Sequence, residues 1–410
     1  MPELFQVTTV AEALQRLLAS VVPLGRAERV ALHAALDRVT AADLHAPADL
    51  PAFARATMDG FAVRAADTYG ASEGLPACLT ICGEVPMGRA AALEVRASQA
   101  ARIHTGGMLP PGADAVVMVE HTQPLDERTI EVVRPVAVGE NVIPPGEDVR
   151  AGQLLLPRGH RMRPQDVGAL AGVGLTEAPV AARPRLAILA TGDEVVPPER
   201  APAPGQVRDI NTFTIAALTR RAGGEPVPCG IAPDEARELA RMAAAALTNA
   251  DVLVISAGSS VSTRDMTAQV IDGLGRPGVL VHGISMHPGK PTILALAGGV
   301  PVFGLPGNPV STMVAFELFV APTLLRLQGC EAAVGTREAQ ARLVRNVASH
   351  PGVEDFVPVR LERRAGELWA DPVFGKSNLI TTMVRADGLL HVPLDRAGIY
   401  AGEMVTVTLF

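Results

Sequence analysis

The second half of the chain alternates short apolar runs with amphipathic stretches. The apolar runs RLAILA, PVPCGI and DVLVIS are typical of buried strands, and residues 209–223, 233–250 and 264–275 carry apolar positions at helical spacing. GVLVHGISM, PTILALAG and VPVFGLPG predict three further strands, and residues 308–329 predict a long helix. Strands that alternate with helices favour a parallel sheet covered on both faces. We therefore expect an α/β domain over residues 183–329.

Two other regions are rich in predicted strands. Between residues 47 and 147, runs such as ACLTICGEV, DAVVMVE and TIEVVRPV alternate with turns, which predicts a compact β-rich inserted domain. Over residues 330–410, EDFVPVRLER, GLLHVPL and EMVTVTL show the same alternation and predict a small β-barrel or sandwich.

The remaining segments have helical periodicity. Thr9 is a candidate cap for a helix over VAEALQRLLASV, and residues 28–39 carry a second helical pattern. A short helix is expected over 164–177. Because these helices flank the insertion, we expect residues 1–46 and 148–182 to form one composite linking domain. The predicted fold class is therefore multidomain α/β.

Length and composition narrow the class of protein. A chain of 410 residues is expected to form two to four domains, and 48% hydrophobic residues can fill several cores. Only 3% of the residues are aromatic, the net charge is −7, and no long basic run occurs. Nucleic-acid binding is not expected, because the chain has no basic run to contact phosphates and few aromatic side chains to stack on bases.

The sequence indicates a cytoplasmic protein. Its first residues do not resemble a signal peptide, and no run of about 18 uncharged apolar residues predicts a membrane span. The four cysteines form no CxxC pair and are expected to be buried, reduced thiols. They are Cys78, Cys82, Cys229 and Cys330.

Three turns with small or polar residues follow predicted strands of the α/β domain. They are TGDE (191–194), Gly258-Ser259-Ser260 and LPGNP. The carboxyl ends of parallel strands meet at one edge of a sheet, so these turns are expected to lie together. Small residues let backbone N–H groups approach an anion, although a tight connection is the structural alternative.

Carboxylates and one cation near these turns suit a phosphate with a divalent metal ion. Asp193 and Glu194 of TGDE and Asp265 are candidate ligands, because Mg²⁺ prefers one or two carboxylates together with phosphate oxygens and water. Lys290, in the turn PGKP, supplies the positive charge that an oxyanion needs. Helix capping is the alternative for Asp265, as it is for Asp209 in RDINT, where Asn211 follows.

The inserted domain adds further candidates. Asp59 lies in MDGF and Thr105 in HTGG, where a plain turn is the alternative reading for Asp59. His104 has no second histidine at ligand spacing, so packing or exposure is favoured over metal binding. Glu147 and Asp148 lie in PPGED, for which a solvated loop is the alternative.

Several motifs stand in a recognisable order. MDGFAV, HTGGMLPPGADAVV, PGEDVRAG, TGDEV, PGKPT and GLPGNPVS follow one another along the chain. In this combination the sequence resembles the molybdopterin molybdenumtransferase family, the MoeA or gephyrin E-domain type. The resemblance spans essentially the whole chain. It implies four domains, including a molybdopterin-binding (MogA-like) domain, an elongated linking domain and a C-terminal β-barrel, and it implies a homodimer.

The resemblance also implies a reaction and roles for matching residues. Adenylylated molybdopterin and molybdate would react to give molybdenum cofactor and AMP, assisted by Mg²⁺. The implied active-site residues are Asp59, Thr105, Asp148, Glu194, Asp234, Asp265 and Lys290, with Glu194 and Asp265 as metal ligands. The residues implied to bind substrate or oxyanion are Gly258, Ser259, Ser260, His287, Pro306, Gly307, Asn308, Pro309 and Ser377.

Two positions depart from the usual family pattern. His287 stands where the family usually has the first lysine of Lys-Pro-Gly-Lys-Pro, and residues 256–262 read SAGSSVS instead of Ser-Gly-Gly-Xaa-Ser-Val-Gly. Losing a lysine removes a permanent cation, because histidine is mostly neutral at pH 7. Arg264 and Lys376 are candidates to replace that charge.

Two other functions stay open at this point. The α/β domain alone resembles the domain that adenylylates molybdopterin, so an adenylyltransferase is one alternative. The inserted and C-terminal domains favour the later step. A non-catalytic scaffold that carries the cofactor is the other alternative, and the carboxylates Asp59, Glu194 and Asp265 argue against it. Other cofactor-synthesis proteins and apo-molybdoenzymes are expected partners.

Overall fold

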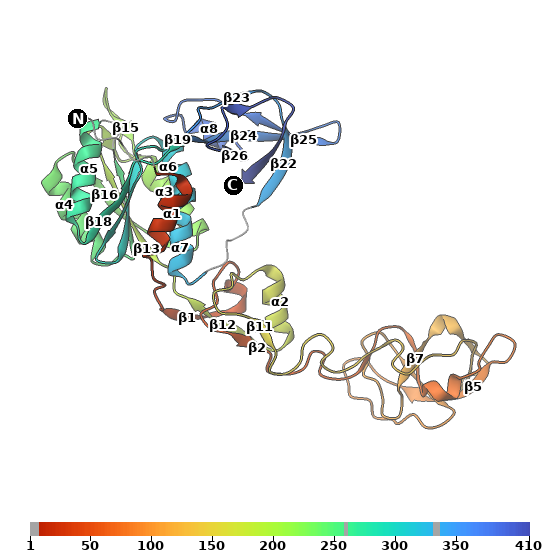
Figure 1. Cartoon of the computed structure of the whole chain (residues 1–410). Coiled ribbons are helices and arrows are strands. Elements are labelled where there is room, and N and C mark those ends of the chain that lie inside the picture. The colour runs from red at the N-terminus through yellow and green to blue at the C-terminus, as the bar shows by residue number, and fades with distance from the viewer. Residues whose placement is uncertain (1–7, 258–260, 331–336) are drawn as a thin grey trace.

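The chain forms an elongated molecule with a β-rich part at one end and an α/β part with a barrel at the other (Figure 1). The computed structural model describes residues 8–257, 261–330 and 337–410. A thinner linking part, made of paired strands from distant segments, stands between the two ends. The predicted multidomain α/β fold is confirmed.

A six-stranded sheet forms the centre of the α/β part. Five strands run in one direction, and β20 runs opposite to both of its neighbours. The expectation of a wholly parallel sheet is therefore wrong at β20. In spatial order the strands are β16 (Glu225–Ala232), β13 (Arg185–Thr191), β17 (Val252–Ala257), β21 (Val300–Pro306), β20 (Ile293–Ala297) and β18 (Pro277–His282).

Gly298 and Gly299 account for the reversed strand. They are the only residues between β20 and β21, which leaves no room for the crossover that parallel strands need. Their φ angles are +59° and +90°, and a tight two-residue hairpin turn requires positive φ at both positions. As a result, β20 begins at the edge where β13, β17 and β21 end. The Pro-Gly turn that precedes β20 is thereby brought to this edge.

Helices cover both faces of the sheet, as predicted. Along β13, Leu186 and Ile188 face one core while Ala187 and Leu189 face the other, because successive side chains of a strand point to opposite faces. The first core is covered by α1 (Val10–Leu18), α3 (Asn211–Arg221) and the long helix 309–327, and the second by α4 (Ala236–Leu247) and α5 (Val261–Gly273).

The long helix has an irregular centre. It consists of α6 (Pro309–Ala315), a π-helical segment (Phe316–Val320) and α7 (Ala321–Leu327). Pro322 has no N–H to donate to the preceding turn, which favours this local irregularity. By length and composition it is the one helix among the described residues that could cross a membrane, but 61% of its most apolar window is buried inside the protein. Such burial is typical of a core helix.

Thr9 caps α1, as predicted. Its hydroxyl accepts a hydrogen bond from the Glu12 N–H, and the Glu12 carboxylate accepts one from the Thr9 N–H, each at 3.2 Å. Val10, Ala13 and Leu17 of this helix pack into the core of the α/β part. This portion of residues 1–46 therefore contributes to the α/β part, although it was expected to join the linking domain.

The helix predicted over residues 28–39 is wrong. Residues Ala27–Ala31 form β1, which pairs antiparallel with β12 (Glu177–Ala181), and only a single 3₁₀ turn follows. Pairing with a distant strand outweighs the weak local preference for helix. The short helix expected over 164–177 is present as α2 (Pro164–Gly172). A second pair of strands completes the linking part: β2 (Leu44–His45) and β11 (Leu154–Leu156).

The inserted and C-terminal parts are β structures. The C-terminal strands close into a barrel, because β24 pairs with both β25 and β26. The inserted sheet has the order β7 (Ala115–Met118), β4 (Gly60–Val63), β6 (Gln99–Ile103), β5 (Ala77–Glu84), β9 (Thr129–Val132) and β8 (Thr122–Pro124). The barrel has the order β24 (Glu354–Arg364), β25 (Glu367–Pro372), β22 (Glu338–Leu343), β28 (Met404–Leu409) and β26 (Gly388–Val392).

Cys78, Cys82 and Cys229 are free thiols. Cys330 is buried and Cys82 and Cys229 are half-buried, but Cys78 is exposed, so the expectation of burial is wrong there. Cys78 lies on β5 at a position that faces away from the core, and this orientation cannot be read from a thiol's general preference for burial.

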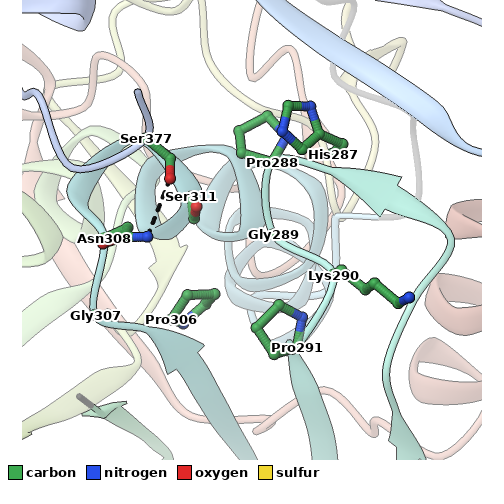
Figure 2. Close-up of a pocket in the computed structure, with 10 residues that line it drawn as sticks. All are labelled: His287, Pro288, Gly289, Lys290, Pro291, Pro306, Gly307, Asn308, Ser311 and Ser377. Carbon is green, nitrogen blue, oxygen red and sulfur yellow. Dashed lines mark hydrogen bonds between the residues drawn. The ribbon is translucent and has the colours of Figure 1, made fainter. Parts of the chain in front are cut away.

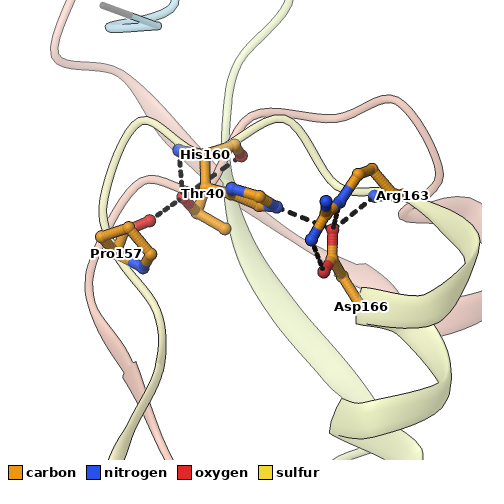
Figure 3. A network of polar contacts seen from close by, with 5 residues as sticks. All are labelled: Thr40, Pro157, His160, Arg163 and Asp166. Carbon is orange, nitrogen blue, oxygen red and sulfur yellow. Dashed lines mark hydrogen bonds and ion pairs between the residues drawn. The ribbon is translucent and has the colours of Figure 1, made fainter. Parts of the chain in front are cut away.

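A polar network ties the segments of the linking part together (Figure 3). The Thr40 hydroxyl donates to the carbonyl of Pro157 at 2.6 Å and accepts from the N–H of His160 at 2.9 Å. The buried Asp166 accepts from His160 Nε2 at 2.7 Å and from the Arg163 guanidinium and N–H at 2.8–2.9 Å. Burial alone would raise the pKa of Asp166, but the hydrogen bonds from Arg163 and His160 prevail and lower it.

Replacing Asp166 by asparagine is expected to loosen α2. The variant loses charged hydrogen bonds at the first turn of the helix, which typically contribute about 1.5–3 kcal/mol each. Amide exchange in α2 should therefore quicken by about tenfold or more at pH 7. Because the pKa of Asp166 is lowered by folding, its stabilisation is present above the ordinary carboxyl range and is lost in acid, so the two proteins should converge as the pH falls.

The matched control is Glu238→Gln. Glu238 forms an ion pair with Arg241 on the surface of α4, at 2.5 Å, and surface ion pairs contribute little to stability. Equal exchange in α2 of wild type and Asp166→Asn at pH 7 would contradict the assignment.

Candidate functional site

The two Pro-Gly turns of the sequence line one pocket at the edge of the α/β sheet (Figure 2). Its volume is about 230 Å³, large enough for a small oxyanion with part of a larger substrate. The turn 288–291 forms one side, and the turn after β21 forms the other. The lining residues are His287, Pro288, Gly289, Lys290, Pro291, Pro306, Gly307, Asn308, Ser311 and Ser377.

Backbone geometry makes both turns rigid. Gly289 has a φ of +118°, and a Cβ atom there would lie 2.1 Å from the Met286 Cε, so the position favours glycine. In the other turn, Pro306 ends β21 and Pro309 begins α6, so proline restricts φ on both sides of Gly307 and Asn308. Groups held in this way need little ordering when a ligand binds.

The C-terminal barrel contributes a wall of the pocket. The Asn308 side chain donates to the Ser377 hydroxyl at 3.0 Å, and the Val310 N–H donates to the Ser377 carbonyl at 3.1 Å. Ser377 follows β25 and was predicted from its motif to lie near the oxyanion. These two bonds fix the loop of the barrel against the start of α6.

Asn211 supports the pocket from beneath. Its side-chain amide donates to the Ser256 hydroxyl at 2.7 Å and to the Gly307 carbonyl at 2.9 Å. It thereby joins the ends of β17 and β21. Asn211 is buried, and its Oδ1 has no partner among the described residues. The sequence offered only its position after Asp209, which caps α3 through the Thr212 N–H at 3.0 Å.

Lysine is rare in this chain and lies at this pocket. Lys290 and Lys376 are the only lysines among the 36 lysine and arginine residues. Lys290 lines the pocket and is exposed, with its side chain extending away from Asn308 and Ser377 (Figure 2). Lys376, the neighbour of Ser377 in sequence, is also exposed. Amine-directed chemistry on side chains is therefore restricted to Lys290 and Lys376.

The acidic residues after β13 form a separate small cluster. The Thr191 hydroxyl donates to Asp234 Oδ1 at 3.0 Å, and the Asp234 N–H donates to Asp193 Oδ1 at 3.1 Å. Glu194 follows and is half-buried. Asp265 lies inside α5 and is exposed, so the alternative of a helix cap is wrong.

No ready-made metal centre occurs within the described ranges. Nowhere in them do three His, Cys, Asp or Glu side chains converge as ligands. The pairing of Glu194 with Asp265 on Mg²⁺ stays a prediction. Gly258, Ser259 and Ser260 lie outside the described residues, as does the side chain of Arg264.

Asp59 and Thr105 meet in the inserted part. Asp59 Oδ1 accepts from the Thr105 N–H at 2.7 Å and from its hydroxyl at 2.9 Å. The N–H bond, then the hydroxyl bond, lower the pKa of the exposed Asp59 against a small effect of burial, with a minor contribution from His104. His104 is exposed and lies 3.3 Å from Glu84.

These residues lie far from the pocket within one chain. Asp59 immediately precedes β4 in the inserted sheet, at the opposite end of the molecule from α6 (Figure 1). Asp148 is exposed and lies between β10 (Val142–Ile143) of the inserted part and β11 of the linking part. A single chain therefore brings together Lys290, the PGNP turn and Ser377, but not Asp59, Thr105 or Asp148.

Comparison with known proteins identifies the family. Three family models match successive segments: the MoeA N-terminal region (domain I and II) at 8–174, the probable molybdopterin binding domain at 187–326, and the MoeA C-terminal region (domain IV) at 340–410. The molybdopterin molybdenumtransferase of Bacillus subtilis is 33% identical over 389 residues, which are 94% of this chain and 90% of that protein. The chain belongs to the molybdopterin molybdenumtransferase family.

Other family members agree over the whole length. Molybdopterin molybdenumtransferase 2 of Mycobacterium tuberculosis is 32% identical, covering 96% of this chain and 97% of its own. The crystal structure of the MoeA molybdopterin biosynthesis protein from Pyrococcus horikoshii superposes with a TM-score of 0.86 at 31% identity, covering 99% of this chain and all of the other. The predicted family, the fold class and the assignment as a transferase are confirmed.

Proposed function

We propose that this member of the molybdopterin molybdenumtransferase family transfers molybdate to adenylylated molybdopterin, releasing AMP and forming molybdenum cofactor. The observation that carries the proposal is the pocket between the two Pro-Gly turns. It lies at the edge where strands β13, β17 and β21 end, and ligands of open α/β sheets bind at such edges.

The pocket offers donors suited to a tetrahedral oxyanion. The hydroxyls of Ser311 and Ser377, the ammonium of Lys290 and backbone N–H groups of the turns can all donate. Fixed donors and positive charge stabilise an anion best when they need no reorganisation, which the proline-bounded turns favour. The Asn308 amide holds the Ser377 oxygen in place and leaves its hydroxyl hydrogen free to reach a ligand.

The acidic residues near β13 and α5 suit Mg²⁺ that is shared with a substrate. Glu194 and Asp265 supply two carboxylates, and Mg²⁺ is usually bound by one or two of these together with phosphate oxygens and water. When bound, the ion would neutralise charge on the phosphoanhydride.

We further propose a homodimer in which a second copy supplies Asp59, Thr105 and Asp148. The support is the distance at which the inserted part lies from the pocket of its own chain (Figure 1). A two-fold arrangement would give two equivalent composite sites. Partners among other cofactor-synthesis proteins and apo-molybdoenzymes, and a cytoplasmic location, belong to the same proposal.

One assay separates the candidate functions. Purified protein is mixed with adenylylated molybdopterin, molybdate and Mg²⁺, and AMP and active cofactor are measured together. We expect both products, and both should depend on molybdate. ATP-dependent adenylylation of molybdopterin would instead identify an adenylyltransferase, and binding of substrate without turnover would identify a scaffold.

Replacing Lys290 by alanine is expected to weaken molybdate binding about tenfold, because one charge-assisted hydrogen bond is lost. Added salt should weaken the wild type in the same direction and affect the variant less. Acetylation offers a direct measurement, since Lys290 and Lys376 are the only lysines. Molybdate should protect Lys290 from acetylation. Lys290→Arg, which keeps the charge, should retain most of the affinity, and equal binding by the alanine variant would remove Lys290 from the oxyanion site.

A further inference from the structure

His287 is held over the pocket by a buried carboxylate of the barrel. Its Nδ1 lies 2.7 Å from Asp355 Oδ1. The two side chains differ sharply in exposure: 75% of the His287 side chain is accessible, but only 10% of the Asp355 side chain. The exposed ring of His287, which lines the pocket, is therefore held in its orientation by the nearly buried carboxylate of Asp355.

Backbone pairing sets this arrangement. The two-residue strand β19 (Met286–His287) pairs in parallel with the start of β24, so that His287 lies opposite Asp355. The N–H of Glu354 donates to the Ser285 carbonyl at 2.9 Å and adds to the same junction. The second oxygen of Asp355 accepts from the Ser349 hydroxyl. The contact between histidine and acid is thus built into the joint between the barrel and the α/β part.

The arrangement determines which ring nitrogen faces the pocket. With Nδ1–H donated to Asp355, Nε2 remains for a ligand. A buried carboxylate is costly unless it is paired, and Ser349 alone offers one neutral donor. A positive partner at His287 meets this need.

We propose that His287 and Asp355 form a couple that supplies the second positive charge of the oxyanion pocket, with Asp355 as its positioning residue. This inference rests on the proposed function and deepens it. Unlike the charge of a lysine, the charge of the couple depends on pH near neutrality, so oxyanion affinity should fall as the pH rises through that range.

Few other charged groups of the described residues face His287. Within residues 8–257, 261–330 and 337–410, Lys290 is the only other charged residue that lines the pocket, and the turn after β21 and α6 bring none to it. From β24 the facing acid is Asp355, since the Glu354 carboxylate is engaged by the Val10 N–H at 3.1 Å and by His391 at 2.9 Å. Lys376 is exposed on the loop that carries Ser377. Lysine keeps its charge across neutral pH, so the expected pH dependence comes from His287.

The first test is calorimetric titration with molybdate alone at pH 6.5 and pH 8.5. Wild type should bind about tenfold more weakly at the higher pH, as one charge-assisted contact is lost. His287→Lys should remove this dependence and bind at pH 8.5 at least as tightly as wild type does at pH 6.5. His287→Gln should bind weakly at both. Equal affinity of wild type at the two pH values, or no binding of molybdate at either, would overturn the proposal.

The second test isolates Asp355. Asp355→Asn should weaken molybdate binding at pH 7 and leave a smaller difference in affinity between pH 6.5 and pH 8.5, because the ring of His287 is no longer held by the carboxylate. The ring proton resonance of His287, assigned with His287→Gln, should move on addition of molybdate in wild type and move less in the variant. Ser349→Ala should change both readouts in the same direction by less. An unchanged affinity difference together with an unchanged resonance shift in Asp355→Asn would overturn its positioning role. If that variant fails to fold, Ser349→Ala still tests the positioning and His287→Lys still tests the charge.

These measurements separate the inference from the proposed function. They require neither adenylylated molybdopterin nor turnover. Loss of the transfer reaction with pH-dependent molybdate binding intact would count against the proposed function alone. Turnover with pH-independent binding would count against the couple alone.

Discussion

Turnover by a Glu194→Gln variant is expected to fall about a hundredfold at saturating Mg²⁺, with folding almost unchanged. Removing one preorganised charge that acts on a transition state typically costs this much. The Glu194 carboxylate makes no hydrogen bond within the described residues, so its loss should not disturb packing. AMP release, measured with thermal unfolding of the same samples, checks both halves of the expectation.

The matched control is Glu199→Gln, an exposed carboxylate on the same loop. Its turnover should equal that of wild type. Asp265→Asn should behave like Glu194→Gln, since both are predicted to serve the same ion. Near-normal AMP release by Glu194→Gln or by Asp265→Asn would remove that residue from the mechanism.

Mixing two inactive variants should restore activity. Asp59→Ala is defective in the inserted part and Asp265→Ala in the α/β part. If each site takes its inserted part from one copy and its α/β part from the other copy, a mixed dimer carries one site with both defects and one site with neither. Complete exchange makes half of the dimers mixed, so roughly a quarter of wild-type activity should return.

A second mixture provides the control. Asp59→Ala with Thr105→Ala places both defects in the inserted part, so every site of every dimer keeps one defect and activity should stay absent. Exchange is verified with subunits of different mass. No recovery in the first mixture despite verified exchange would mean that each chain builds its site alone.

Local patterns predicted the central strands of the α/β sheet well. The runs at 185–191, 252–257 and 300–306 became neighbouring parallel strands that end at one edge. The meeting of the PGKP and PGNP turns depends in addition on the direction of β20. That direction was available in the pair Gly298-Gly299, a typical hairpin signal, which the expectation of a parallel sheet obscured.

Contacts between distant segments could not be predicted in the same way. Asp355 lies 68 residues from His287 and no motif marks it, so only the pairing of β19 with β24 reveals the couple. The apolar positions over 28–39 do have helical spacing, but the backbone of residues 27–31 forms hydrogen bonds with β12 instead of a helix. Asn211 gained its role only when β17 and β21 became neighbours.

The pocket has a consequence for how the α/β part and the barrel move with respect to each other. Its walls come from both the α/β part and the barrel, through Ser377 and the Asp355 contact. A ligand that touches both walls therefore binds best when the barrel is docked. By thermodynamic linkage, the factor by which docking tightens oxyanion binding equals the factor by which the oxyanion tightens docking. An anion bound to both walls would therefore act as a non-covalent cross-link, and the barrel would be harder to displace while the anion is bound.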